Sequence, residues 1–235
     1  MKNKFFKYTE PIVFYSCLAL NVLIVLHFDY ISSMDAPAHL YYSRIINYLY
    51  SGNSLINSFF TINKTLSPNL TDHYLLALFN TVFRSTVSNK LLILIFFAGF
   101  PLCFRYIIKK YNPGGIALSS LSIPFTHCFL FYMGFYNFIL SFTFILISII
   151  YYLHHFLDTK DKYSAKEYIT FMFLVLLNYF TNGISFLYLG ITCGLIELYK
   201  LSISTHENGV DRKLWVRHIL LLVLIWLPGL IMLYI

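Results

Sequence analysis

Long apolar runs, separated by short polar breaks, fill most of this 235-residue chain. Most of them predict helices that cross a membrane, because roughly 20 apolar residues in an α-helix span the hydrocarbon core of a bilayer. The predicted spans cover about residues 11–30, 89–108, 116–131, 138–155, 168–180, 184–199 and 214–235. The expected fold class is therefore all-α, a polytopic transmembrane helical bundle of about seven spans, taken as one transmembrane domain over residues 1–235.

The longest polar segment, residues 29–88, separates the first two predicted spans and predicts two amphipathic helices. The first begins after Asp35, which can cap it, and ends where Ser-Gly-Asn at 51–53 stops the pattern. Pro37 is tolerated in its first turn, because the backbone N–H that proline lacks has no partner there. An amphipathic helix of this kind beside a span lies naturally in the membrane interface.

The second amphipathic helix opens in the polar sequence 67–73, after a loop at 51–69 that is rich in Ser and Asn. Its apolar body, residues 74–83, is too short to cross a bilayer. We therefore expect two amphipathic helices on the outer surface, both within the first outer loop.

Lysine and arginine are distributed unevenly over the predicted loops. With the N-terminus inside, thirteen of the 17 fall on the inner side, and the other four are Arg44, Lys64, Arg84 and Lys90. Cytoplasmic loops of membrane proteins carry such an excess. The N-terminus is therefore expected in the cytoplasm and the 29–88 loop on the outer side. Making 72–85 a full span would send most of the lysines outside.

The composition excludes a soluble globular domain, because only 11% of the residues are charged, against about a quarter in such domains. The net charge of +7 does not indicate nucleic-acid binding, since the basic residues are scattered between apolar runs. The four cysteines lie inside apolar segments without paired spacing, which is typical of buried small hydrophobic residues. Because the sequence is apolar up to Ile235, we expect it to be the N-terminal part of a longer chain.

Candidate chemistry lies in the polar segment. Asp35 and His39 are four residues apart and so share one face of the first helix, while Asp72 and His73 open the second. A carboxylate at the membrane surface can act as a general base toward an acceptor hydroxyl, and an imidazole can hold a phosphate or move a proton. Arg44 can pair with a lipid-linked phosphate.

Each of these residues also has a structural alternative. Asp35 and Asp72 can cap helices, and Arg44 can extend toward lipid headgroups. His39 and His73 can be ordinary interfacial histidines.

A divalent metal ion held by Asp35, His39 and Asp72 is a further alternative, although no dense ligand motif requires a metal. Tyr136 and Asn137, in the break before the fourth predicted span, can contact a sugar or end a helix. The predicted topology places all of these residues on the outer side of the membrane.

The order of these motifs resembles bacterial polytopic membrane proteins related to the GT-C glycosyltransferases. The likeness is carried by the apolar first span, by Asp35-Ala36-Pro37-Ala38-His39 with Arg44 after it, by Pro68-Asn69-Leu70-Thr71-Asp72-His73, and by Gly134-Phe135-Tyr136-Asn137-Phe138. The resemblance implies a bacterial inner membrane and a role for Asp35 as the catalytic base in transfer from a polyprenyl-phosphate sugar. It implies donor or acceptor contacts for His39, Arg44, Asp72 and His73. The chain departs from the family pattern in having Asn182 where a histidine is expected, and in having fewer spans.

The expected function is thus that of an integral membrane glycosyltransferase, with membrane lipids and a polyprenyl-phosphate sugar as partners. The alternative is a non-catalytic membrane protein, such as a transporter, a lipid-handling protein or an assembly subunit. A transporter would place ionisable residues at mid-membrane and show repeated halves. The predicted spans hold almost no charge and show no internal repeat, which favours chemistry at the surface.

Overall fold

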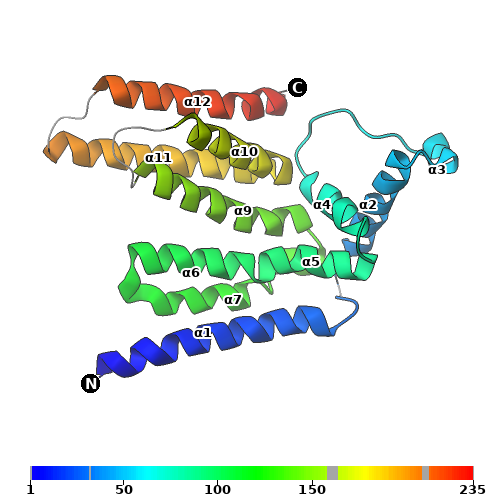
Figure 1. The fold of residues 1–235 in the computed structure, drawn as a ribbon, viewed down its shortest axis with the longest axis horizontal. Helices are drawn as coiled ribbons and strands as arrows, with labels where there is room; N and C mark the ends of the chain where they lie inside the picture. The colour runs from blue at the N-terminus through cyan, green and yellow to red at the C-terminus, as the bar shows by residue number, and fades with distance from the viewer. Residues whose placement is uncertain (1, 32, 158–163, 208–211, 235) are drawn as a thin grey trace. The chain divides into compact units, whose positions relative to one another are not determined.

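The computed structural model describes residues 2–31, 33–157, 164–207 and 212–234, and over these residues the chain is helical and contains no strand (Figure 1). The α-helices are α1 (Lys2–His27), α2 (Ala36–Tyr50), α3 (Ser54–Phe59), α4 (Thr71–Asn80), α5 (Ser85–Phe97), α6 (Gly99–Tyr111), α7 (Ser122–Phe125), α8 (Phe129–Met133), α9 (Tyr136–Tyr152), α10 (Ala165–Thr181), α11 (Gly183–Glu207) and α12 (Arg212–Tyr234). A 3-10 helix covers Pro113–Leu121, and a π-helical turn covers Leu153–Leu157.

Five helical stretches within the described residues are long and apolar enough to cross a membrane. They are Thr9–His27, Ser85–Tyr111, Pro113–Met133, Tyr136–Phe156 and Gly183–Ser202. This confirms the all-helical prediction and indicates an integral membrane protein. The other two predicted spans correspond to α10, which has 17 residues, and to the shorter apolar stretch His218–Tyr234, so the count of seven stays a prediction.

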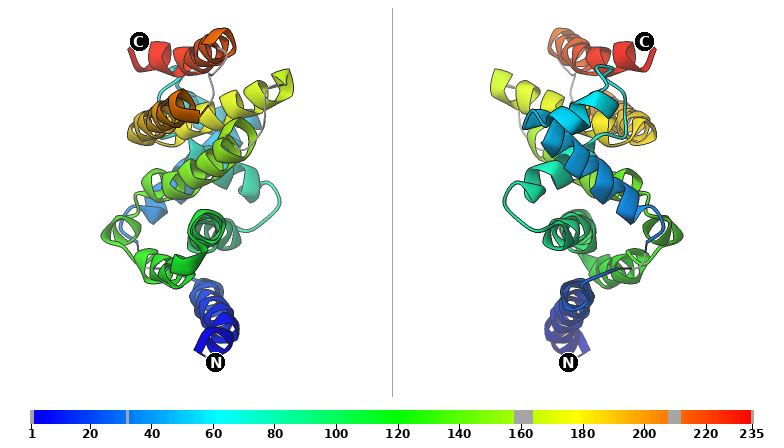
Figure 2. Two further views of the ribbon diagram at one scale, coloured as in Figure 1. Left: turned by 90° about the vertical axis from the view of Figure 1, so that its left-hand side faces the viewer. Right: turned by 90° about the vertical axis from the view of Figure 1, so that its right-hand side faces the viewer.

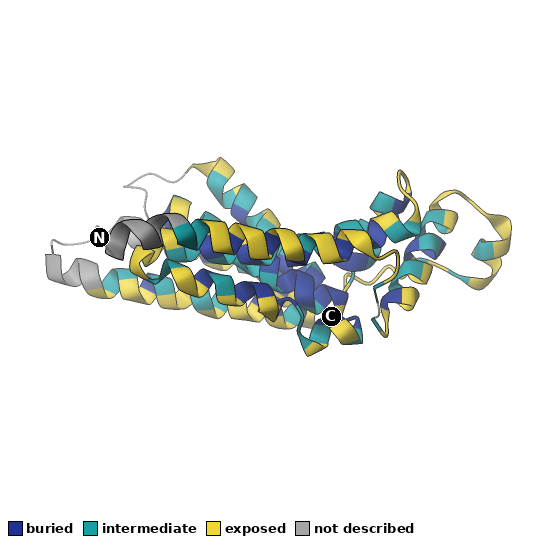
Figure 3. Cartoon of the chain, turned by 90° about the horizontal axis from the view of Figure 1, so that it is seen from below, coloured by how far each residue is buried: buried dark blue, intermediate teal, exposed yellow. Residues whose placement is uncertain are grey.

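Large apolar side chains are exposed along these helices, as the yellow positions in Figure 3 show. Leu20 and Leu23 on α1 are more than half exposed, as are Leu195 and Leu198 on α11. A water-soluble monomer rarely exposes contiguous apolar surface of this extent. Hydrocarbon chains of lipid would cover it at no cost in hydrophobic free energy.

The chain divides into two compact units, with the boundary inside α9. Unit 1 consists of Met1–Thr65 and Leu70–Thr143. In it, α5 and α6 follow each other along one helical stretch, which packs beside α1 and beside the helical segments between Pro113 and Met133, while α2 packs against α4 and α4 against α5. Figures 1 and 2 show α2 and α4 at the end of unit 1 where α1 finishes and α5 begins.

Unit 2 consists of Leu66–Asn69 and Phe144–Ile235. Its α10 packs against both α11 and α12, around a core of aromatic and aliphatic side chains. The short segment Leu66–Asn69 belongs here because the Tyr179 hydroxyl donates to the Leu66 carbonyl at 2.9 Å. Asn182 separates α10 from α11, and its Oδ1 accepts the backbone N–H groups of Ile184 and Ser185 and so caps α11.

The polar segment between α1 and α5 folds largely as the sequence predicts. The first amphipathic helix ends at Tyr50, and Gly52 adopts the left-handed φ of +73° in the turn that follows. The second, α4, has ten residues and is too short to cross a bilayer. The predicted loop 51–69 contains one helix that the pattern did not predict, α3, because the Asn53 side chain accepts the N–H of Ile56 and caps it.

The third predicted span, 116–131, is not one continuous α-helix. It begins as the 3-10 helix, continues through α7, and is interrupted before α8. Gly134 then adopts φ +83° ahead of α9. The segment before α2 pairs with this break, since the N–H groups of Met34 and Asp35 donate to the carbonyls of Tyr132 and Met133 at 3.0 and 3.2 Å. These two hydrogen bonds place the start of α2 beside Gly134.

Candidate functional site

The polar face of α2 packs against α4 instead of facing water. The Nδ2 of Asn80, at the end of α4, donates to Ser43 Oγ at 2.9 Å, and both residues are buried. One turn further along α2, Asn47 Nδ2 donates to the Ala77 carbonyl at 3.0 Å. The face of α2 that carries His39, Ser43 and Asn47 is therefore mostly an interface with α4, and this alignment brings His39 to the start of that helix.

His39, Asp72 and His73 form a cluster of three side chains, called here the His39–Asp72–His73 cluster. Nδ1 of His39 lies 2.5 Å from Asp72 Oδ2 and 3.1 Å from His73 Nε2. On its other side, His39 Nε2 donates to the Gly134 carbonyl at 3.0 Å. Among the described residues, this is the one group of three His, Cys, Asp or Glu side chains whose ligand atoms all lie within 4.8 Å of one another.

Asp72 is the buried centre of the cluster, with 0% of its side chain exposed. Its Oδ1 accepts Asn137 Nδ2 at 2.6 Å and the His73 N–H at 2.7 Å, and its own N–H donates to Asn137 Oδ1 at 2.9 Å. Oδ2 is also buried, and it pairs with Nδ1 of His39 when that nitrogen carries a proton. Leu70 holds the N-cap position of α4, and Asp72, in the first turn, accepts the His73 N–H there in addition to its contacts with His39 and Asn137.

The pKa values of the two histidines move in opposite directions. Burial lowers the pKa of His39, but contact with Asp72 and the negative charge of Asp72 outweigh burial, and the Gly134 carbonyl and the Asp35 charge act in the same sense as Asp72. The pKa of His39 therefore lies above its ordinary value. Burial holds the pKa of His73 below its ordinary value, because the opposing charge of Asp72 is weaker there and His39 adds to the lowering. Separated pKa values in neighbouring titratable groups are typical of functional sites.

Asp35 lies at the N-cap position of α2, but its side chain accepts no capping hydrogen bond. The predicted alternative role of Asp35 as a cap is therefore not realised. Asp35 is exposed, and its charge contributes to the raised pKa of His39. The carboxylate is thus available beside the cluster without being part of its buried contacts.

Tyr136 and Asn137, in the first turn of α9, contact His39 and Asp72 of the cluster. The Tyr136 ring stacks on the His39 ring with centroids 5.2 Å apart and an interplanar angle of 24°. Both residues are buried, and Asn137 holds Asp72 through the two hydrogen bonds described above. They support the cluster, and direct sugar contact by either of them stays a prediction.

Arg44 is not brought to the cluster. It lies further along α2, where its Nε donates to Ser85 Oγ at the first residue of α5, at 2.8 Å. Among the interactions of the described residues, none joins Arg44 to His39, Asp72 or His73.

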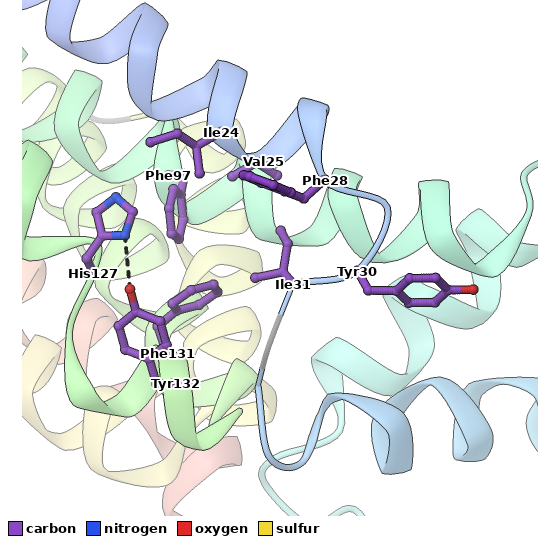
Figure 4. A pocket seen from close by; sticks show the side chains of 9 residues that line it. All are labelled: Ile24, Val25, Phe28, Tyr30, Ile31, Phe97, His127, Phe131 and Tyr132. Atoms are coloured by element: carbon purple, nitrogen blue, oxygen red, sulfur yellow. Dashed lines mark hydrogen bonds between the residues drawn. The ribbon is translucent and has the colours of Figure 1, made fainter.

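An apolar pocket of about 200 Å³ lies in the same unit, between the end of α1 and the helices around α8 (Figure 4). Its lining residues are Ile24, Val25, Phe28, Tyr30, Ile31, Phe97, His127, Phe131 and Tyr132. The polar atoms of His127 in its wall have partners, since Nε2 donates to Oδ1 of Asn21, outside the lining, at 2.8 Å and Nδ1 lies 3.5 Å from the Tyr132 hydroxyl. The remaining surface suits a hydrocarbon ligand.

Two features of the structure were missed by the sequence interpretation. The Gly134 carbonyl is a hydrogen-bond partner of His39, although the only signal in the sequence was a glycine that breaks an apolar run. In unit 2, buried Glu197 accepts a hydrogen bond from Tyr152 at 2.6 Å and lies 3.4 Å from Nε2 of buried His218. The polar residues of this second group each stand alone in apolar sequence, so no local pattern connects them.

Comparison with protein-family models, curated proteins and solved structures gave no match for this chain. The chemistry of the His39–Asp72–His73 cluster and its surroundings is therefore the basis for a functional assignment.

Proposed function

We propose that the protein is an integral membrane glycosyltransferase of the GT-C type, which transfers a sugar from a polyprenyl-phosphate donor at the outer face of the membrane. The observation that carries the proposal is the buried Asp72 carboxylate in contact with two partly exposed histidines. Beside them lies the carboxylate of Asp35, which makes no capping hydrogen bond to α2. Enzyme sites bring together carboxylates and imidazoles in unlike environments in this way, because they need proton acceptors and donors of different strength.

In the proposed reaction, Asp35 accepts the proton of the acceptor hydroxyl as that oxygen attacks the anomeric carbon of the sugar. A new bond forms between the acceptor oxygen and the anomeric carbon, while the bond from that carbon to the phosphate oxygen breaks. The leaving polyprenyl phosphate keeps the bonding electron pair. Asp35 fits the role of the base because it is exposed and its side chain makes no capping contact, whereas Asp72 is buried under the two histidines.

His39 and His73 would bind the donor phosphate. Their side chains keep 17% and 21% of their surface exposed, so an anionic group can reach ring atoms that Asp72 and Tyr136 hold in place. The arrangement of the cluster gives Arg44 no such place, because Arg44 is bound to Ser85.

The apolar pocket supports a lipid-linked donor. Ile31 in its wall lies four residues before Asp35, and the backbone of Tyr132, also in the wall, accepts the N–H of Met34. An isoprenoid chain in the pocket would therefore keep its phosphate close to the start of α2. The excess of inner lysine and arginine supports a cytoplasmic N-terminus, an outward-facing site and, with the resemblance, a bacterial inner membrane.

The test is sugar transfer by the protein in lipid vesicles that contain a panel of radiolabelled polyprenyl-phosphate sugars. Asp35→Asn should lower turnover at least about 100-fold, since a general base typically contributes that much. Asp29→Asn is the matched control, because Asp29 is an exposed carboxylate in the same loop whose partner is Lys90 at 3.5 Å. Equal turnover in wild type and Asp35→Asn, or no turnover with any donor, would contradict the proposal.

A further inference from the structure

Three electron-pair donors converge at the His39–Asp72–His73 cluster. His39 Nε2 donates its proton to the Gly134 carbonyl, so the neutral ring presents a lone pair at Nδ1. That atom lies 3.1 Å from His73 Nε2 and 2.5 Å from Asp72 Oδ2. Two ring nitrogens and a carboxylate oxygen from two helices thus meet in one place.

Hydrogen bonding satisfies this group only when His39 carries a second proton, on Nδ1. Asp72 Oδ2 is fully buried and lies 2.5 Å from Nδ1 of His39, so it is paired only while that nitrogen carries a proton, and a buried carboxylate is costly unless it is paired or coordinates a metal. A proton on His39 Nδ1 has two neighbouring acceptors, Asp72 Oδ2 and His73 Nε2, and can be aligned well with only one of them. A cation between the three atoms would interact favourably with all of them.

We propose that Nδ1 of His39, a carboxylate oxygen of Asp72 and Nε2 of His73 bind a divalent transition-metal ion of the zinc class. Imidazole nitrogen and carboxylate oxygen are ligands that suit Zn²⁺ and its neighbours in the first transition row, and the nitrogen donors disfavour Mg²⁺. This ligand set replaces the one considered from the sequence, because exposed Asp35 lies outside the group and His73 lies inside it.

The separations between the ligand atoms fit such an ion after small side-chain adjustments. Two ligands at ordinary Zn–N and Zn–O bond lengths in a tetrahedral arrangement are about 3.4 Å apart. The His39–His73 separation of 3.1 Å is close to this value, and the 2.5 Å separation from His39 to Asp72 needs to open by about 1 Å.

The surroundings of the cluster match those of metal ligands. A ligating histidine almost always donates its second N–H to a carbonyl or a carboxylate, and ligating carboxylates are themselves hydrogen-bonded. His39 donates to the Gly134 carbonyl, and Asp72 Oδ1 accepts from Asn137 and from the His73 backbone. These contacts leave His39 Nδ1 and Asp72 Oδ2 facing each other, 2.5 Å apart, beside His73 Nε2.

Three protein ligands leave a coordination position open, as in catalytic zinc sites. The partial exposure of both histidine side chains gives solvent or an anionic oxygen a path to that position. In the proposed function the two histidines bind the donor phosphate, and with the ion present they would do so through it. That step rests on the proposed function, whereas binding of the ion itself does not.

The experiment measures metal binding by tag-free protein in detergent after chelator treatment and dialysis. Zn²⁺, Co²⁺, Mn²⁺ and Mg²⁺ are titrated in competition with a chromophoric chelator, and Co²⁺ absorption reports the ligand environment. Wild type should bind one Zn²⁺ or Co²⁺ per chain, and Mg²⁺ should not compete. His73→Gln should weaken binding at least about 100-fold, because even residues that only support ligands contribute 10- to 100-fold.

Asp72→Asn is the second variant, and His154→Gln is the matched control because His154 is an exposed histidine of unit 2. Size exclusion and helical circular dichroism establish that each variant is folded. Lack of Zn²⁺ binding by wild type would overturn the proposal, as would unchanged binding in folded His73→Gln and Asp72→Asn. Metal binding without sugar transfer would support this inference and contradict the proposed function, so the two can fail separately.

Discussion

Each unit of the protein contains a buried carboxylate beside a histidine, and the two groups differ in what surrounds them. In unit 2, Glu197 Oε1 accepts the Tyr152 hydroxyl at 2.6 Å and lies 3.4 Å from His218 Nε2. The other ring nitrogen of His218 contacts the Tyr168 hydroxyl at 2.8 Å. In unit 1, the carboxylate of Asp72 faces two histidines.

The two groups also differ in how far their side chains are exposed. The side chains of His218 and Glu197 keep 2% and 5% of their surface exposed, against 17% and 21% for His39 and His73. One oxygen of Glu197 also lacks a hydrogen-bond partner, but the described residues place no second histidine beside it. Tyrosine hydroxyls thus hydrogen-bond to the unit 2 group and join its helices, whereas the two histidine side chains of the unit 1 group stay partly exposed. A carboxylate beside an imidazole is therefore a structural contact between helices in unit 2 and a candidate functional site in unit 1.

The largest expected effect is on stability in unit 2. Glu197→Ala should lower the free energy of unfolding by about 3 kcal/mol, because it removes one partner of a buried polar group. Unfolding in mixed detergent micelles, followed by circular dichroism, measures the change. Asp35→Ala is the control and should stay within about 0.5 kcal/mol of wild type, since Asp35 is exposed. A Glu197→Ala protein as stable as wild type would show that the unit 2 group is not a packing contact.

Gly134→Ala should lower the free energy of unfolding by about 2 kcal/mol, because the backbone conformation at φ +83° strains any residue with a Cβ. The added Cβ would also lie 2.7 Å from both the Asp35 nitrogen and Ser33 Oγ. Gly52→Ala is the matched control, with φ +73° and nothing within 4 Å of its Cβ, and should cost about 1 kcal/mol. Equal losses in the two variants would mean that the contact between the start of α2 and Gly134 adds nothing.

Asn137→Ala should weaken Zn²⁺ binding about tenfold while leaving all three ligands in place, because Asn137 orients Asp72. Asn47→Ala also removes a side-chain hydrogen bond, from α2 to Ala77 of α4, but touches no ligand. Its affinity should equal that of wild type in the same chelator competition. If both variants bind as wild type does, Asn137 has no part in orienting Asp72.

The smallest effect is expected at Arg44. Arg44→Ala should lower the free energy of unfolding by about 1 kcal/mol through loss of its hydrogen bond to Ser85, and should leave Zn²⁺ affinity unchanged. Sugar transfer in vesicles should fall less in this variant than in Asp35→Asn. A loss as large as that of Asp35→Asn would place Arg44 at the donor phosphate after all.

Local sequence patterns were sufficient for most of the helices, although not for α3 or the breaks in the third span, and for the identity of most polar residues in the cluster. The 3.6-residue periodicity of α2, the short apolar body of α4 and the turn at Gly52 depend on neighbouring residues, and the structure confirms all three. The i, i+4 spacing of Asp35 and His39 likewise follows from helix geometry.

The roles within the cluster were decided by tertiary structure. The contacts of the cluster join residues that are distant in sequence: 34 residues separate His39 from His73, 65 separate Asp72 from Asn137, and 95 separate His39 from Gly134. Which aspartate is buried, where Arg44 binds and which ring nitrogen faces Asp72 all depend on how α2 and α4 pack against each other and against the break before α9. Periodicity defines which face of a helix is polar, but the partner of that face is set by packing between segments that are distant in sequence, and so it could not be derived from the sequence alone.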